Sequence, residues 1–465
     1  MLINNNTNHY QSAEGKAISG GSYKQLFILL ASWLVIGITL GIISIPALLL
    51  LSLYLQNKGH YLYLFAAFFF TLILSDSRIY ALSFSQDLKT LLMILLLVPF
   101  LFPQRVSLVF DLKKSLYQPF IVYATFALFS LIYSPVVFTG FQKTLSYFLL
   151  ILIVPIIFYS LYNQHKLYLL KSIIYLGVLV LVAGYVMYLI NPDWVMYNKG
   201  VRTSGALGNP NGLGMFCFLF YILYFTVKHY FPDLFTKREN LLIQLLIFSS
   251  MLWSGSRGQT IALLIFIVTQ HLSRKNKTVG LLLSAAIGIA LVTIDIDVVA
   301  IAQTLGFEEY LRVDTLDKAG GRVVAREFAW EQIQKNFWIG RGFSYTEWIY
   351  GQHFTELSMR GHEGNAHNAF LTVWLDTGLI GLIFFIIGWG IIFLKAAKNS
   401  FLAFPILFAV VASNMVESWL AASLNPFTIQ LLMVLTLLVF IVNDQDKDQA
   451  QLLSSPPMPR ILIKF

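Results

Sequence analysis

Charged residues and cysteine are scarce in this 465-residue chain. Asp, Glu, Lys and Arg make up only 12% of the sequence, whereas soluble domains carry roughly 25%. The single cysteine, Cys217, excludes an intrachain disulfide, and its place in an apolar run favours a buried thiol. The chain also lacks the glycine-rich motifs that bind soluble nucleotides. These absences argue against an ordinary soluble enzyme.

Long apolar runs dominate instead, with 57% hydrophobic residues and a mean hydropathy of +0.71. A segment that crosses a bilayer must satisfy its own backbone hydrogen bonds, so such runs form helices. They lie near 26–40, 42–55, 61–75, 88–102, 116–134, 144–162, 172–190, 211–228, 240–254, 257–272, 279–295, 369–394, 400–413 and 423–441. We predict an all-α polytopic membrane protein with about 12–14 transmembrane helices. The first two runs form either one long helix or a re-entrant pair around Gly41 and Pro46.

Lysine and arginine gather on alternate connections, which predicts the orientation by the positive-inside rule. The connections 76–87, 135–143, 191–210, 254–257, 296–368 and 414–422 then face outward, and both termini lie in the cytoplasm. The predicted organisation has five parts. They are a disordered N-terminus (1–24), a first set of transmembrane helices (25–295), a large periplasmic loop with short helices (296–368), a second set of helices (369–442) and a flexible cytoplasmic tail (443–465).

Two short outer connections carry arginines. Arg202 precedes a Gly-, Pro- and Asn-rich turn, in which Asn211 is the predicted N-cap of the next helix. A helix N-terminus at a membrane surface favours an anion. Arg257 lies in the connection Ser254-Gly-Ser-Arg-Gly258, where a charge so close to hydrocarbon is costly unless it faces water or an anionic partner. For both arginines the alternative is a side chain that reaches to interfacial water.

The large outer loop is the most polar part of the chain. Arg322 follows two glycines, and the spacing of Trp330, Ile333 and Phe337 predicts a short amphipathic helix. Gly-Arg341-Gly is a predicted turn. Several aromatic residues follow that suit the membrane interface or stacking on sugars: Trp338, Phe343, Tyr345, Trp348, Tyr350 and Phe354.

Histidines and acids lie where the loop returns to the membrane. His362, Glu363 and His367 match no familiar zinc spacing, so we expect no metal site. His367 stands at the outer mouth of a predicted span, where a group that titrates near neutral pH suits a general base. The alternative is an ordinary hydrogen-bonded surface histidine. Asp376 and Glu417 are the acids at span ends, and either of them can orient a histidine or pair with an arginine.

Several outward-facing arginines with one histidine indicate chemistry on a lipid-linked anion. The planar guanidinium of arginine makes two parallel hydrogen bonds to phosphate or diphosphate. Transfer of a sugar from a diphosphate needs a base for the acceptor hydroxyl and positive charge for the leaving group. The residue types present therefore meet both needs without a metal.

The order of these motifs resembles the O-antigen ligase and O-antigen (exopolysaccharide) polymerase superfamily. The motifs that carry the resemblance span roughly residues 195–395, and the earlier spans match only in hydrophobicity. They are Arg202 to Asn211, Ser254 to Gly258, Arg322 through Trp330 to Gly340-Arg-Gly342, and His367-Asn368. The resemblance implies a GT-C-like glycosyltransferase architecture of about twelve helices in a bacterial inner membrane. It also implies glycan transfer from an undecaprenyl-diphosphate carrier without a metal or nucleotide cofactor.

The same resemblance implies roles for individual residues. His367 resembles the catalytic base, and Arg257 and Arg322 resemble the arginines that bind the diphosphate, with Arg202 as a contributor. An attack opposite the diphosphate inverts the anomeric centre. Supporting roles fall to a further set of residues: Asn211, Arg341, His362, Asn368 and Glu417. The acceptor is a growing glycan or lipid A-core, and a flippase and a chain-length regulator are the expected protein partners. We favour polymerase over ligase because the outer loop is long and aromatic.

Two other classes of function remain open. One is a secondary transporter of a small anion such as bicarbonate, although a transporter places ionisable or discontinuous elements near the membrane midplane. The other is a non-catalytic subunit of a polysaccharide export complex.

Overall fold

The computed structural model describes residues 23–101, 111–197, 201–275, 278, 282, 320–362 and 364–442. The following parts of the chain lie outside these described residues: the predicted N-terminal segment up to residue 22, the predicted span at 279–295 except for residue 282, the start of the outer loop at 296–319, Glu363 and the predicted tail at 443–465.

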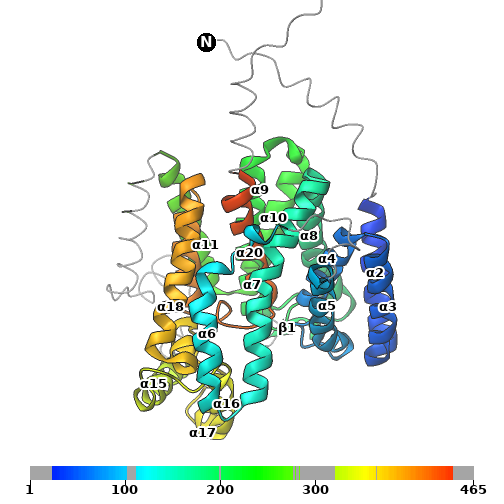
Figure 1. Ribbon diagram of the computed structural model, residues 1–465. Coiled ribbons are helices and arrows are strands. Elements are labelled where there is room, and N and C mark those ends of the chain that lie inside the picture. The colour runs from blue at the N-terminus through cyan, green and yellow to red at the C-terminus, as the bar shows by residue number, and fades with distance from the viewer. Residues whose placement is uncertain are drawn as a thin grey trace, which may run out of the picture.

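Helices make up nearly all of the described structure (Figure 1). The α-helices are α2 (Tyr23–Leu40), α3 (Ser44–Asn57), α4 (Tyr61–Leu74), α5 (Phe84–Leu101), α6 (Ile121–Ser130), α7 (Val137–His165), α8 (Leu167–Ile190), α9 (Pro210–Tyr230), α10 (Lys237–Ser254), α11 (Arg257–Lys275), α15 (Gly320–Lys335), α16 (Tyr345–Gln352), α17 (Phe354–Met359), α18 (Ala369–Asn399), α19 (Ala403–Asn414) and α20 (Pro426–Thr436). The two strands are β1 (Met196–Tyr197) and β2 (Arg202–Thr203), which pair antiparallel.

Six helical segments of the described residues are long and apolar enough to cross a membrane: Tyr23–Asn57, Tyr80–Phe100, Val137–His165, Leu167–Ile190, Pro210–Tyr230 and Ala369–Asn399. Shorter apolar helices accompany them at Tyr61–Leu74, Gln118–Tyr133, Ala403–Asn414 and Pro426–Ile441. The prediction of an all-α polytopic membrane protein is therefore confirmed.

The first helical segment turns sharply at Gly41, between α2 and α3. Gly41 has φ +55°, a left-handed conformation that glycine adopts without steric cost. Tyr63 donates to Gln25 at 3.2 Å and Trp33 donates to Thr71 at 3.0 Å, so α4 runs parallel to α2.

Helix α5 packs beside α4. Its first residue, Phe84, contacts Gly37 near the end of α2, so α5 runs antiparallel to α2 and α4. Gln56, at the end of α3, donates to the carbonyl of Leu95 far along α5. The helix α3 therefore runs back toward the start of α2, and the turn at Gly41 joins a helical hairpin.

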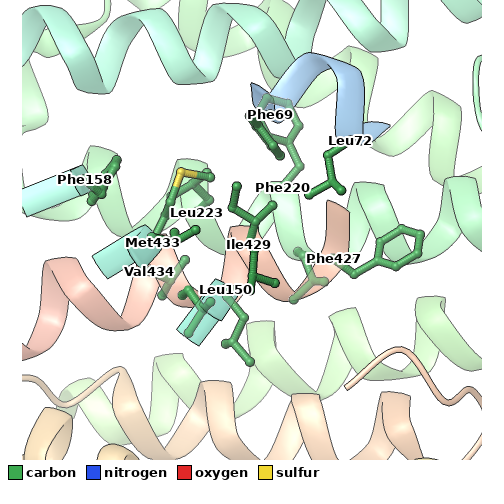
Figure 2. Close-up of a cluster of buried hydrophobic side chains, with 14 of the residues drawn as sticks. Phe69, Leu72, Leu150, Phe158, Phe220, Leu223, Phe427, Ile429, Met433 and Val434 are labelled. Atoms are coloured by element: carbon green, nitrogen blue, oxygen red, sulfur yellow. The ribbon is translucent and has the colours of Figure 1, made fainter. Parts of the chain in front are cut away.

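The helix α20 forms the centre of the hydrophobic core. Every residue from Pro426 to Thr436 is buried. Figure 2 shows side chains from α4, α7 and α9 packed around it, among them Phe69, Phe158 and Phe220. Helices that expose one face, such as α8, surround this core and present apolar side chains outward. An apolar outward surface is what a helix bundle presents to lipid.

The short helices α15, α16 and α17 gather at one end of the bundle (Figure 1). They pack on one another through a small second core that includes Phe328, Ile349 and Leu357. The described part of the outer loop is thus a compact cap on that end.

The cap is anchored at a break in α18. Gly378 has φ +70° and ψ −178°, so the helix predicted as a continuous span is interrupted there. The amide of Leu379 donates to the carbonyl of Phe337 at 2.8 Å, and Ile380 donates to Trp338 at 3.3 Å. Carbonyl groups of the loop therefore replace the helical acceptors that the break removes.

Candidate functional site

The turn before α9 places Arg202 and Asn211 next to each other. Arg202 belongs to strand β2, and one of its terminal nitrogens donates to Asn211 Oδ1 at 2.8 Å. The prediction that Asn211 caps α9 is wrong, because Asn209 is the N-cap and accepts from the amide of Gly212 at 2.8 Å. Asn211 lies inside the first turn, which frees its side chain to contact other elements.

The α10–α11 turn provides a second contact for Arg202. Its Nε donates to the carbonyl of Ser254 at 2.7 Å. Gly255 follows with φ +57°, and a Cβ there would lie 3.2 Å from that Nε, so the guanidinium group rests directly on the turn. Arg257, half-buried, begins α11, and Gly258 packs against Val416. This packing brings the start of α11 beside the connection that contains Glu417.

Helix α15 directs two arginines toward the same connection. Arg322 donates to Glu417 Oε1 at 2.8 Å, and its side chain remains 41% exposed. Arg326, one turn later, donates to the carbonyl of Met415 at 3.0 Å. Like charges at this spacing on a helix repel each other, so this face of α15 favours an anion nearby.

His367 is held in an unusual backbone conformation at the entry to α18. Its φ is +44°, a region that residues other than glycine rarely adopt. Its amide donates to Asn365 Oδ1 at 2.8 Å. Asn368 caps α18 by accepting from Phe370 and Leu371, and its side-chain nitrogen donates to the carbonyl of Met415 at 3.3 Å. The backbone on both sides of the histidine is thereby fixed.

Glu417 connects these groups. It is only 8% exposed. Its Oε1 accepts from Asn211 at 2.9 Å and from Arg322 at 2.8 Å, and its Oε2 lies 3.3 Å from His367 Nδ1. One buried carboxylate thus joins α9, α15 and the start of α18, which are far apart in the sequence.

The pairing with Glu417 selects the tautomer of the His367 imidazole. A carboxylate only accepts hydrogen bonds, so Nδ1 of His367 carries the proton that points to Glu417. In the neutral ring Nε2 is then an acceptor. A Cβ built on Gly364 would lie 3.5 Å from this nitrogen, and Gly364 has φ +127°. A glycine at this position therefore keeps the face of Nε2 open.

The other predicted residues have different places. His362 is buried, and its ring lies 5.7 Å from that of His367, centroid to centroid. Arg341 is exposed, and its Nε donates to Asn336 of the same loop at 2.9 Å rather than to a residue of the Glu417 cluster. Within the described ranges, no three His, Cys, Asp or Glu side chains gather in a way that could hold a metal.

Asp376, the other acid considered from the sequence, has a separate role. Its carboxylate accepts from the amide of Ser344 at 2.9 Å and from the amide and hydroxyl of Thr346, each at 2.7 Å. It is buried, and its backbone carbonyl accepts from Gly342 at 2.7 Å. Asp376 therefore anchors the outer loop to α18.

Two residues near the cluster were not predicted. Arg326 shares a helix face with Arg322, and the four-residue spacing between the two arginines could have predicted this. Asp76 follows α4 and accepts from the amide of Gly208 at 3.1 Å. Burial raises the pKa of Asp76, although the Gly208 amide and the charge of Lys89 oppose this rise. No local sequence signal connects residue 76 with the turn before α9.

Comparison with known proteins finds a family model that matches part of the chain. Residues 242–386 match the family model described as O-antigen ligase. This match confirms the resemblance inferred from the motifs, and it supports glycan transfer of the O-antigen ligase or polymerase type. No curated protein matches the chain. The matched region contains Arg257, Arg322 and His367, whereas Asn211 and Glu417 lie outside it and join it through hydrogen bonds.

Proposed function

We propose that the protein transfers a glycan from an undecaprenyl-diphosphate carrier to an acceptor sugar hydroxyl at the Glu417 cluster. The observation that carries this proposal is the pairing of one carboxylate with both His367 and Arg322. The proposed base and a proposed ligand of the diphosphate thus share one partner, which supports the proposal. Either group alone has an ordinary structural explanation, whereas the combination suits glycosyl transfer.

In the proposed reaction the acceptor hydroxyl oxygen forms a bond to the anomeric carbon of the donor sugar. The bond between that carbon and the diphosphate oxygen breaks, and the diphosphate leaves with the electron pair. His367 Nε2 takes the hydroxyl proton, and the resulting imidazolium is stabilised by Glu417 through Nδ1. Attack from the face opposite the diphosphate inverts the configuration, and no metal enters the steps.

Arginines supply the positive charge for the leaving group. Arg202, Arg257 and Arg322 are the proposed diphosphate ligands. Glu417 pairs with one of them, Arg322, at 2.8 Å. Preorganised charge of this kind acts most strongly where charge develops in the transition state. Asn211 links Arg202 to Glu417, because it accepts from Arg202 and donates to Glu417.

We place the protein in the bacterial inner membrane, with the cluster on the outer face and both termini in the cytoplasm. The acceptor is a glycan chain or lipid A-core, and we favour chain polymerisation over ligation. Phe343, Tyr345 and Tyr350 are buried and cannot stack on sugars, whereas Trp338 and Phe354 of the outer loop are exposed and offer surfaces for stacking. A flippase and a chain-length regulator are the proposed partners.

The break in α18 is the feature that a transporter would share. Here the groups at the break are occupied by the outer loop: Phe337 and Trp338 accept from the freed amides, and Asp376 is surrounded by donors. This arrangement favours a fixed anchor for the cap over an ion pathway. We therefore prefer glycan transfer to anion transport.

A deletion strain and the variant His367→Ala test the proposal. Lipid-linked saccharides extracted from the deletion strain should accumulate as single repeats if the protein is a polymerase, and as long chains if it is a ligase. The His367→Ala variant should show the same accumulation. If polymer length and ligation stay normal while this variant remains abundant in the membrane, the protein is not an enzyme of this type.

A further inference from the structure

Asp76 is a half-buried acid that has no part in the reaction proposed above. It follows the end of α4, in a connection predicted to face outward. Its Oδ2 accepts from the amide of Gly208 at 3.1 Å, across 132 positions of sequence. A charge that is partly removed from water is costly unless it is hydrogen-bonded. The contacts of Asp76 therefore indicate what its carboxylate does in the fold.

The carboxylate of Asp76 lies against the start of α9. A Cβ built on Gly212, the third residue of α9, would lie only 3.0 Å from Asp76 Oδ2. The backbone amides at a helix start carry partial positive charge, which favours an anion there. The sequence predicts an anion at this helix start, and in the structure Asp76 is that anion. The start of α9 thus has a negative partner before any substrate binds.

Gly208, just before α9, is held on both of its backbone polar groups. Its amide donates to Asp76, and its carbonyl accepts from the Tyr197 hydroxyl at 2.8 Å. A Cβ built on Gly208 would collide with the backbone carbonyl oxygen of Asp76, so only glycine allows this close approach. The end of α4 and strand β1 therefore fix the position of the turn that leads into α9.

The first turn of α9 carries Asn211 into the Glu417 cluster. Asn211 accepts from Arg202 at 2.8 Å and donates to Glu417 Oε1 at 2.9 Å. A shift of the turn by about 1 Å would lengthen both contacts beyond hydrogen-bonding distance. Asp76 is therefore connected to Glu417, and through Glu417 to His367, by the backbone at the start of α9.

We propose that Asp76 is a positioning residue, which fixes the first turn of α9 so that Asn211 stays between Arg202 and Glu417. The inference rests on the proposed function, and it adds a residue that does not touch the substrate. The two properties of the carboxylate have different effects. Its oxygen positions the turn by accepting from Gly208, whereas its negative charge stabilises the helix start.

Steady-state kinetics of the purified full-length protein with a synthetic lipid-linked repeat unit test this role. Asp76→Ala should lower kcat at least about tenfold and leave KM near the wild-type value, because misplaced groups act on the reacting geometry. Asp76→Asn keeps an acceptor for the Gly208 amide and should restore most of the kcat. The matched control is Asp87→Ala, which removes an exposed acid from the first turn of α5. Equal losses in Asp76→Ala and Asp87→Ala, or no rescue by Asp76→Asn, would overturn the proposal.

A double-mutant cycle tests whether Asp76 acts through Asn211. If it does, adding Asp76→Ala to Asn211→Ala should cause no further loss of kcat, because the contacts that Asp76 positions are already absent. Losses that multiply in the double variant would show an independent effect and overturn the proposal. If Asp76→Ala fails to fold, Tyr197→Phe takes its place in the cycle, because it removes only the hydroxyl that donates to Gly208. The same absence of a further loss is then expected, and losses that multiply overturn the proposal.

Amide hydrogen exchange separates this inference from the proposed function, because it needs no substrate. Peptides from the segment 202–212 should exchange faster in Asp76→Ala than in the wild type, and at the wild-type rate in Asp87→Ala. Unchanged exchange in Asp76→Ala, or faster exchange with a normal kcat, refutes the positioning role and leaves the reaction intact. Faster exchange in a protein whose wild type transfers no glycan refutes the reaction and leaves the hold of Asp76 on the turn intact.

Discussion

Replacing Glu417 by Gln changes the hydrogen-bonding state of His367 while it keeps the shape of the side chain. Glu417 Oε1 accepts from Asn211 and Arg322, and Oε2 faces His367 Nδ1. In the Glu417→Gln side chain, the amide oxygen accepts from Asn211 and Arg322 as Oε1 did, so the NH₂ group faces His367. Nδ1 then becomes the acceptor, and the ring proton moves to Nε2. The nitrogen proposed as the base can no longer take a proton.

The size of the effect follows from the lost proton transfer. General base catalysis contributes about 10²–10⁴-fold to a rate. Loss of this contribution corresponds to about 3–5 kcal/mol in activation free energy. The effect on folding is smaller, because the contacts with Asn211 and Arg322 remain as hydrogen bonds to a neutral acceptor. We expect a change of about 1 kcal/mol in the free energy of unfolding. The predicted signature is therefore a low kcat in a stably folded protein.

The assay is transfer from a synthetic lipid-linked repeat unit by the purified variant. Membrane abundance and the midpoint of thermal unfolding are measured on the same samples. Glu347→Gln is the matched control, because Glu347 belongs to the outer loop, is 62% exposed and pairs with Lys143 away from the cluster. We expect that control to retain normal activity. If Glu417→Gln keeps more than roughly a tenth of the wild-type kcat, then the carboxylate does not set the state of a general base.

Three further predictions concern the arginines, the opening beside His367 and the loop anchor. Arg322→Ala should lower kcat by about 10²–10³-fold through lost charge stabilisation. The control Arg341→Ala should stay within about twofold of wild type, because Arg341 is exposed and bonded to Asn336. Equal loss of kcat in both variants would contradict the placement of the diphosphate. Gly364→Ala should lower kcat/KM about tenfold, since it strains φ +127° and places a methyl group near Nε2, and unchanged steady-state kinetics would refute this. Asp376→Ala should lower the free energy of unfolding by about 3 kcal/mol and expose the outer loop to trypsin, because it removes the hydrogen bonds to Ser344 and Thr346. A cleavage pattern like that of wild type would count against the anchor.

The sequence was sufficient to predict the helices because hydropathy and helix length are local properties. The match to the O-antigen ligase family bears out the resemblance, and it covers the motifs from Ser254 to Asn368 but not the motif from Arg202 to Asn211. The roles of the site residues stay predictions, although the described structure does bring Arg202, Asn211, Arg322 and His367 into one cluster through Glu417.

Only the tertiary structure shows which of two acids, Glu417 or Asp376, is the partner of His367. Glu417 and Asp376 both stand at the ends of spans, and their local sequences do not distinguish a partner for histidine from an anchor for a loop. The partners of Glu417 lie 206 and 95 positions away in the chain, at Asn211 and Arg322. Only the packing of α9, α15 and α19 places them together, and no spacing rule covers such distances.

Backbone features were also hidden from the sequence. Apart from Asp376 and Thr377, the segment around Gly378 is apolar, so hydropathy predicts a continuous span where α18 is in fact broken. The left-handed conformation of His367 is equally unexpected, because residues with a side chain rarely adopt it. In both places the outer loop supplies the hydrogen bonds that stabilise the irregular backbone.

We propose that His367 and the Glu417 cluster transfer a glycan from a polyisoprenyl diphosphate. The most direct measurement uses the purified protein in lipid nanodiscs, a synthetic undecaprenyl-diphosphate-linked repeat unit and a chelator. We predict glycan extension with inversion at the anomeric carbon, equimolar release of undecaprenyl diphosphate, and loss of both in His367→Ala. No release by the wild-type protein, or equal release by a folded His367→Ala variant, would contradict glycan transfer by His367.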